Sequence, residues 1–229
     1  MIPLGGIPLY RRHAGTRRRG GRSLLPPLTI LPWVAAIDLL GIAVFAASGA
    51  LAAAHKGQTL VTFAFFALVT GVGGGTVRDL LIGAPVFWVQ DWRVPAVCLS
   101  MALLVWITPK RIWREKALDW FDAFGLAAYA VFGAAKALAF GVPPLPAVMM
   151  GVITACVGGV IRDVLAGEPS ILLRPEIYVT AAAVASALFV LLEGAGTGTP
   201  IAAGVAATAG FVLRGIAIRR GLGLPGYRR

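Results

Sequence analysis

Two segments of the chain place glycines beside a cation and an anion inside long apolar runs. In the first, three consecutive glycines precede Arg78 and Asp79, and in the second, two glycines precede Arg162 and Asp163. Charged groups are costly in hydrocarbon, so within a membrane segment they usually face a cavity or a pathway. We therefore predict that both segments line a route for ions or small solutes. The predicted pathway residues are Gly73, Gly74, Gly75, Arg78, Asp79, Gly158, Gly159, Arg162, Asp163 and, as argued below, Lys136.

The glycines themselves suggest how such a route could form. Each glycine in a helix interior costs about 1 kcal/mol relative to alanine. We predict that the helices containing Gly73 to Gly75 and Gly158 to Gly159 kink or unwind there, because exposed carbonyls can replace part of a cation's hydration shell. The alternative is close helix packing, since small residues line helix contacts in membranes. An ion pair follows the glycines both times, and this favours the pathway.

The charged residues also need partners within the bundle. Neighbouring residues on a helix project about 100° apart, so Arg78 and Asp79 need not pair with each other. Asp38 and Arg78 fall at one predicted depth, and Asp122 and Arg162 at another. We predict ion pairs between Asp38 and Arg78 and between Asp122 and Arg162. For the two aspartates, we expect a structural role as charge partners rather than contact with ions.

Lys136 lies deep in a predicted span, where its counterpart in the other half of the chain is Ala52. A lone lysine at this depth costs about 3 kcal/mol unless it faces water or a partner. One interpretation is a structural lysine that forms a salt bridge or reaches the headgroups. We favour a role in the pathway, either limiting or gating cation flux or holding a lipid headgroup.

The composition indicates an integral membrane protein. Of 229 residues, 58% are hydrophobic and 14% charged, and the mean hydropathy is +0.82. The net charge of +11 fits basic segments on anionic headgroups better than nucleic-acid binding. Cys98 and Cys156 fall in apolar spans and are expected to pack as small hydrophobes. We see no catalytic constellation and no metal-ligand cluster, so we expect neither an enzyme nor a cofactor.

Seven apolar segments approach the ~20 residues that cross a bilayer. They cover residues 33–54, 59–83, 93–108, 118–140, 145–167, 175–193 and 199–218. Residues 1–32 form a basic tail that we expect to be disordered, 33–218 the transmembrane domain, and 219–229 a basic C-terminal tail. The fold class predicted is therefore an all-α integral membrane protein with kinked second and fifth helices.

An internal repeat organises these segments. At a constant offset of 84 residues, the two glycine and Arg-Asp motifs coincide without a gap, as do Asp38 with Asp122 and Gly41 with Gly125. Each copy, 33–108 and 118–193, holds three spans, so the second copy enters from the opposite side of the membrane. This predicts an inverted repeat followed by an unpaired seventh helix, 199–218.

Orientation follows from the distribution of Lys and Arg. The first loop, loop 109–117 and the C-terminal tail fall on one side, and together they carry most of the loop charge. Basic loops favour the cytoplasm. We predict an external N-terminus and a cytoplasmic C-terminus, although the arginines of the N-terminal tail favour the reverse.

The chain resembles the prokaryotic trimeric intracellular cation (TRIC) channels at its two Gly-Gly-x-x-Arg-Asp motifs. The resemblance extends over about residues 35–218. It implies a homotrimer in a prokaryotic plasma membrane, with one pore per subunit lined by the second and fifth helices and permeable to potassium and sodium. Animal relatives carry an acidic residue after the lysine of the fourth helix, whereas Ala137 follows Lys136 here, so the resemblance lends little support to lipid-headgroup binding.

Two other functional classes stay open on the sequence. Inverted repeats with broken helices also occur in secondary transporters, for instance of a small solute such as glycine. A membrane scaffold, in which the glycines serve packing alone, is the third interpretation. Single-channel current steps, saturable coupled uptake, or neither would distinguish the three.

Overall fold

The computed structural model describes residues 32–109, 112–113, 117–173 and 177–223. These parts contain eight α-helices and one short 3-10 helix. The elements are α1 (Pro32–His55), α2 (Leu60–Leu81), α3 (Phe87–Gln90), α4 (Arg93–Ile107), α5 (Ala117–Ala139), α6 (Pro144–Ala166), η2 (Ile171–Leu173), α7 (Val179–Gly194) and α8 (Thr199–Arg220). The prediction of an all-α protein is confirmed. The N-terminal tail and most of the C-terminal tail lie outside the described residues.

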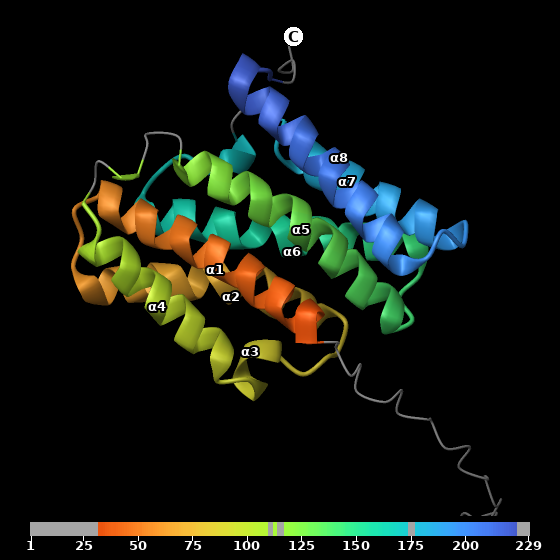
Figure 1. The fold of residues 1–229 in the computed structure, drawn as a ribbon, viewed down its shortest axis with the longest axis horizontal. Coiled ribbons are helices and arrows are strands. Elements are labelled where there is room, and N and C mark those ends of the chain that lie inside the picture. Colours follow the sequence, from red (N-terminus) through yellow and green to blue (C-terminus); the bar gives the residue numbers. More distant parts are fainter. Residues whose placement is uncertain (1–31, 110–111, 114–116, 174–176, 224–229) are drawn as a thin grey trace, which may run out of the picture.

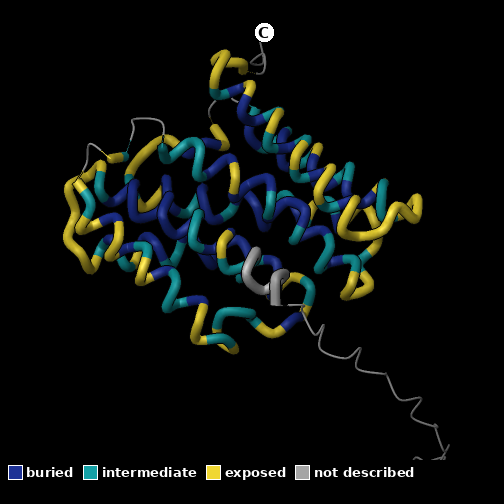
Figure 2. Tube along the Cα trace, viewed as in Figure 1, coloured by how far each residue is buried: buried dark blue, intermediate teal, exposed yellow. Residues whose placement is uncertain are grey.

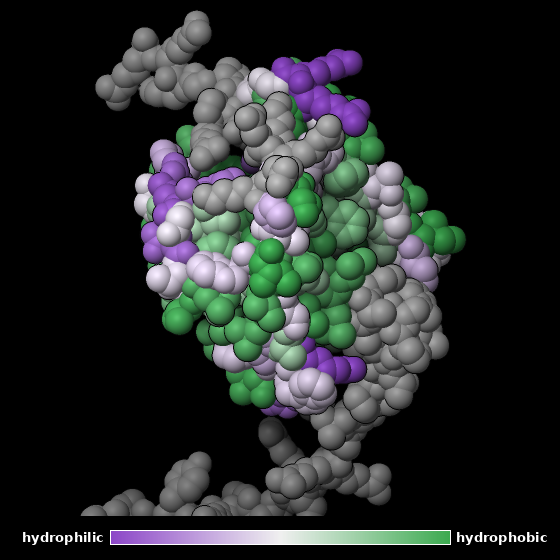
Figure 3. Space-filling view, turned by 60° about the vertical axis from the view of Figure 1, so that its left-hand side comes forward, coloured by the Kyte–Doolittle hydropathy of each residue, from purple (hydrophilic) through white to green (hydrophobic). Residues whose placement is uncertain are grey.

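Five helices, α1, α2, α5, α6 and α8, have an apolar length sufficient to cross a membrane. Helices α4 and α7 are apolar but have only 15 and 16 residues. Apolar side chains gather across the middle of the face shown in Figure 3, and hydrophilic ones lie towards its edges. This distribution suits a bilayer environment.

The helices form two groups joined by a central seam. Helices α1, α2 and α4 pack together, and α5, α6, α7 and α8 form the second group (Figure 1). Contacts of α2 with α6 and of α1 with α5 join the groups. Buried residues concentrate along this seam (Figure 2), and many of them are alanines, such as Ala46, Ala50, Ala130 and Ala134. Small side chains let the helix backbones approach closely.

Positions 84 residues apart share local structure. Gly83 and Gly167 follow α2 and α6 with φ of 68° and 65°. Behind them, the amide of Ala84 donates to the Asp79 carbonyl at 2.8 Å, and the amide of Glu168 donates to the Asp163 carbonyl at 3.0 Å. These left-handed glycine caps end both helices in the same way.

Contacts between the two groups are also reciprocal. A Cβ on Gly41 would lie 2.5 Å from the Tyr129 ring, and a Cβ on Gly125 would lie 2.9 Å from the Phe45 ring. Both members of the first contact have their counterpart, at the same offset, in the second. Such exchange is what a twofold relation between the halves would produce.

The glycine-rich stretches do not unwind. Helix α2 is continuous through Gly73 to Gly75, and α6 is continuous through Gly158 and Gly159. The prediction of unwound segments with exposed carbonyls is therefore wrong for this structure. The reason is that the neighbouring helix occupies the space a side chain would need, so the glycines permit contact between intact helices. A bend that keeps the helical conformation stays a prediction.

Candidate ion pathway

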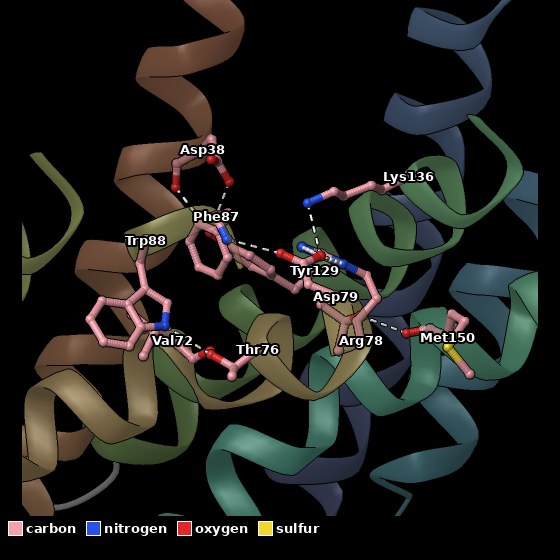
Figure 4. A network of polar contacts seen from close by, with 11 residues as sticks. Asp38, Val72, Thr76, Arg78, Asp79, Phe87, Trp88, Tyr129, Lys136 and Met150 are labelled. Atoms are coloured by element: carbon pink, nitrogen blue, oxygen red, sulfur yellow. Dashed lines mark hydrogen bonds and ion pairs between the residues drawn. The ribbon is translucent and has the colours of Figure 1, made fainter. Parts of the chain in front are cut away.

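The first Arg-Asp site joins three elements through one carboxylate. Asp79 on α2 accepts hydrogen bonds at Oδ1 from Arg78 Nε at 2.9 Å and from Lys136 Nζ at 2.8 Å. At Oδ2 it accepts the backbone amide of Phe87, at the start of α3, at 3.1 Å. Figure 4 shows Lys136 reaching from α5 towards Asp79. Asp79 is fully buried, so this set of donors stabilises its charge.

Aromatic side chains enclose the Arg78 guanidinium. Its Cζ lies 5.3 Å from the Phe132 ring centroid and 5.9 Å from that of Phe87. The Trp88 indole closes the same region by donating to Thr76 Oγ1 at 3.0 Å. Arg78 Nη1 is buried and has no hydrogen-bond partner among the described residues. A buried donor of this kind needs water to satisfy it.

The second Arg-Asp site repeats the first with different neighbours. Arg162 Nε donates to Asp163 Oδ1 at 2.9 Å, and the Ile171 amide of η2 donates to Asp163 Oδ2 at 2.8 Å. Both bonds correspond to those of the first site, offset by 84 residues. Arg162 Nη1 also bonds Asp122 Oδ1 at 2.7 Å and the Ser48 hydroxyl. Ser48 holds the position equivalent to Phe132.

Of the two predicted ion pairs, only Asp122–Arg162 is formed. Asp38 instead accepts a hydrogen bond from the Tyr129 hydroxyl at 3.0 Å. Tyr129 packs against Gly41, one turn along α1 from Asp38, and this places its hydroxyl at the carboxylate. The expectation that neighbouring Arg and Asp need not pair is wrong at both sites, because the long arginine side chain curves back to the adjacent carboxylate.

The remaining predicted residues fall around the α2–α6 seam. A Cβ on Gly74 would lie 2.1 Å from the Thr154 carbonyl oxygen, and one on Gly158 would lie 2.5 Å from the Thr70 carbonyl oxygen. Gly73 faces Ile161 across the same seam. The close-packing interpretation of these glycines is thus the one that the structure shows.

The two outer glycines lie at the charged sites. Gly75 lies under the Phe87 ring, and Gly159 faces the Tyr178 hydroxyl and Asp122. A side chain at either position would displace these groups. The role of Tyr178 was not predicted, because this residue has no partner in the repeat pattern and lies between spans. Ser48 could have been found as a polar side chain within an apolar run.

A cavity of about 200 Å³ adjoins the second site. Its lining residues are Ala52, His55, Lys56, Leu118, Asp119, Arg162, Asp163, Ala166, Glu168 and Ile171. Ala52 here stands where Lys136 stands at the first site. The shorter side chain leaves space that Lys136 fills at the other end of the pathway.

Solved structures with this arrangement are cation channels. The structure of the TRIC channel orthologue from Rhodobacter sphaeroides superposes with a TM-score of 0.77 at 40% identity, covering 84% of this chain and all of that one. A second TRIC cation channel structure gives a TM-score of 0.77 at 30% identity and covers 85% of this chain and 97% of that one. The chain belongs to the prokaryotic TRIC family.

Sequence relatives agree with TRIC membership. A membrane protein of Vibrio cholerae is 40% identical over 203 residues, 83% of this chain and 81% of that protein. The inner membrane protein YadS of Escherichia coli is 44% identical over 148 residues, 63% of this chain and 72% of that protein. The family model described as "Glycine transporter" matches residues 35–110 and 119–194. These two matches coincide with the two halves of the internal repeat.

Proposed function

We propose that this TRIC-family chain forms a passive channel for monovalent cations, chiefly potassium and also sodium. The observation that carries the proposal is the pair of buried Arg-Asp sites flanking the α2–α6 seam, in a fold shared with solved cation channels. Buried charges of this kind usually accompany an ion or proton pathway in membrane proteins. The pathway would run between α2 and α6 within one subunit, past both sites.

The proposed architecture has seven spans arranged as two inverted repeats, 33–108 and 118–193, with the seventh helix 199–218. Reciprocal contacts such as Gly74 with Thr154 and Gly158 with Thr70 support it. Helices α4 and α7 would cross a locally thin or well-packed region, because both are short. We also propose an external N-terminus, which cysteine labelling in loop 109–117 tests. Labelling from outside only would reverse the orientation.

We propose that three copies assemble, each with its own pore, in the plasma membrane of a prokaryote. A homotrimer is consistent with the trimeric channels that share the fold. Membrane lipids are the other expected partners, and neither nucleic-acid binding nor catalysis is part of the proposal. The mass of the detergent-solubilised protein, measured by native mass spectrometry, checks the subunit number, and a monomer or dimer would contradict it.

Recording from the purified protein in planar bilayers with opposed potassium and sodium gradients tests the channel. We expect discrete current steps whose reversal potential follows the cation gradient rather than the chloride gradient. Reversal at the chloride potential would contradict cation selectivity. A bilayer protein without current steps would contradict the channel itself.

A secondary transporter of a small solute such as glycine is the alternative, and the description of the matching family model favours it. Such a protein would show saturable glycine uptake into proteoliposomes coupled to a proton or sodium gradient. Uptake that saturates and follows the imposed gradient, without current steps, would replace the channel proposal.

A further inference from the structure

The two ends of the pathway differ in one decisive residue. Both Arg-Asp pairs have the same backbone amide on the aspartate and the same glycine cap behind it. At the first site, Lys136 Nζ reaches Asp79 at 2.8 Å and occupies the approach. At the second site, Ala52 leaves the approach to Asp163 open as a cavity. The ends are therefore unequal, although their frameworks match.

Charged residues surround the mouth of this cavity. Lys56, after α1, forms an ion pair with Glu168, after α6, at 2.5 Å, and both side chains are exposed, by 38% and 46%. The equivalent positions at the first site are Phe140 and Ala84, which cannot form such a pair. The charged mouth is thus a feature of one end alone.

The cavity has room for hydrated ions and a negative balance of charge. A volume of about 200 Å³ holds roughly six water molecules at liquid density. Among its lining residues, Asp119, Asp163 and Glu168 outnumber Lys56 and Arg162 by one formal charge when His55 is neutral. Arg162 and Asp163 are already paired with each other. The charges nearest the mouth are therefore those of Lys56 and Glu168.

We propose that the cavity is the cation-collecting vestibule of the pathway, and that Glu168 sets its cation concentration while Lys56 restrains it. The proposal rests on the cation-channel function above and names the residues that tune entry at one end. Charged groups lining a concave mouth raise the local concentration of counter-ions. An exposed ion pair is weak, so Glu168 can exchange between Lys56 and an entering cation.

Single-channel recording at low and high ionic strength tests this proposal on Lys56 and Glu168. A unit charge some 6–7 Å away in water changes local cation concentration by about threefold. We expect Glu168→Gln to lower cation conductance by up to about threefold at low salt and Lys56→Gln to raise it. Both changes should vanish near 1 M salt, where the Debye length is about 3 Å. Glu193→Gln, after α7 and away from the cavity, is the matched control.

A measurement without current separates this inference from the channel proposal. Cys98 and Cys156 are buried, so His55→Cys adds one accessible thiol at the cavity lining. We expect a cationic methanethiosulfonate to modify it faster than an anionic one, and Glu168→Gln to reduce this rate ratio by up to about ninefold, since the two reagents respond oppositely. An unchanged ratio, or an equal change with Glu193→Gln, would overturn the vestibule. Missing current steps in the wild type would instead contradict the channel.

Discussion

At the residue scale, each buried aspartate of the pathway is held by more donors than one arginine provides. Asp79 receives Arg78, Lys136 and a backbone amide, whereas Asp163 receives Arg162 and a backbone amide. Asp122 supplies the extra contact at the second site, through Arg162. The first site therefore has an added cation and the second an added anion. This difference gives the two ends opposite electrostatic bias.

Removing Lys136 tests the bias at the first site. In Lys136→Ala, Asp79 keeps Arg78 and the Phe87 amide, but the local charge becomes more negative by one unit. We expect a larger cation conductance or a higher open probability in planar bilayers. Lys136→Arg, which keeps the charge, serves as control. Unchanged conductance and gating in Lys136→Ala would remove Lys136 from the pathway.

Asp122→Ala tests the buried pair at the second site. Removing one partner leaves Arg162 Nη1 bonded to Ser48 alone, and breaking a buried pair typically costs about 3–5 kcal/mol. We expect a clear fall in the thermal unfolding midpoint in detergent. Asp91→Ala provides the comparison, because its pair with Arg93 is partly exposed and should contribute at most about 1 kcal/mol. Equal shifts for the two variants would contradict the assignment.

Sequence reasoning reached one of the two ion pairs at this scale. Asp122 and Arg162 could be paired because the repeat puts them at one depth. The contact of Lys136 with Asp79 was missed, although both residues were assigned to the pathway. Depth and helix angle describe where a Cβ points, whereas long side chains choose partners by reach. Aromatic neighbours such as Tyr129 also compete for the same carboxylates.

At the element scale, the α2–α6 seam depends on four backbone contacts without side chains between them. The Cα atoms of Gly74 and Gly158 face the carbonyls of Thr154 and Thr70. The helices stay continuous there, so the seam is a contact between two intact rods. Movement of one helix along the other would have to pass these matched contacts.

Gly74→Ala is the corresponding test. Its Cβ would lie 2.1 Å from the Thr154 carbonyl oxygen, so α2 and α6 must separate. We expect destabilisation of about 3 kcal/mol despite the better helix propensity of alanine. Gly204→Ala on α8 meets nothing within 4 Å and should be neutral or slightly stabilising. Unfolding midpoints in detergent compare them, and a neutral Gly74→Ala would contradict a tight seam.

The long helices were predicted to within a few residues, because apolar length and glycine punctuation mark their ends. Segment 118–140 corresponds to α5 (Ala117–Ala139), and 145–167 to α6 (Pro144–Ala166). The short elements α3 and η2 were not predicted, since three or four residues show no periodicity. Their position is fixed instead by amides that bond Asp79 and Asp163.

At the scale of the whole molecule, matched frameworks with unequal fillings make the two ends interchangeable in principle. Exchanging the residues of one matched position, as Ala52→Lys with Lys136→Ala, tests this. We expect the new lysine to reach Asp163 as Lys136 reaches Asp79, filling the cavity. Modification of a cysteine at position 55 should then slow strongly. Ala52→Met, which adds similar volume without charge, is the control, and an unaltered rate in the exchanged variant would contradict the prediction.

The reciprocal contacts of Gly41 with Tyr129 and of Gly125 with Phe45 concern ancestry as well as packing. Each half recognises the other through residues that both halves possess, so recognition does not require a covalent link between them. Two separately encoded fragments, divided within 109–117, should therefore find one another in the membrane and co-purify. A half-length forebear inserted in both directions would have assembled by the same contacts before gene fusion.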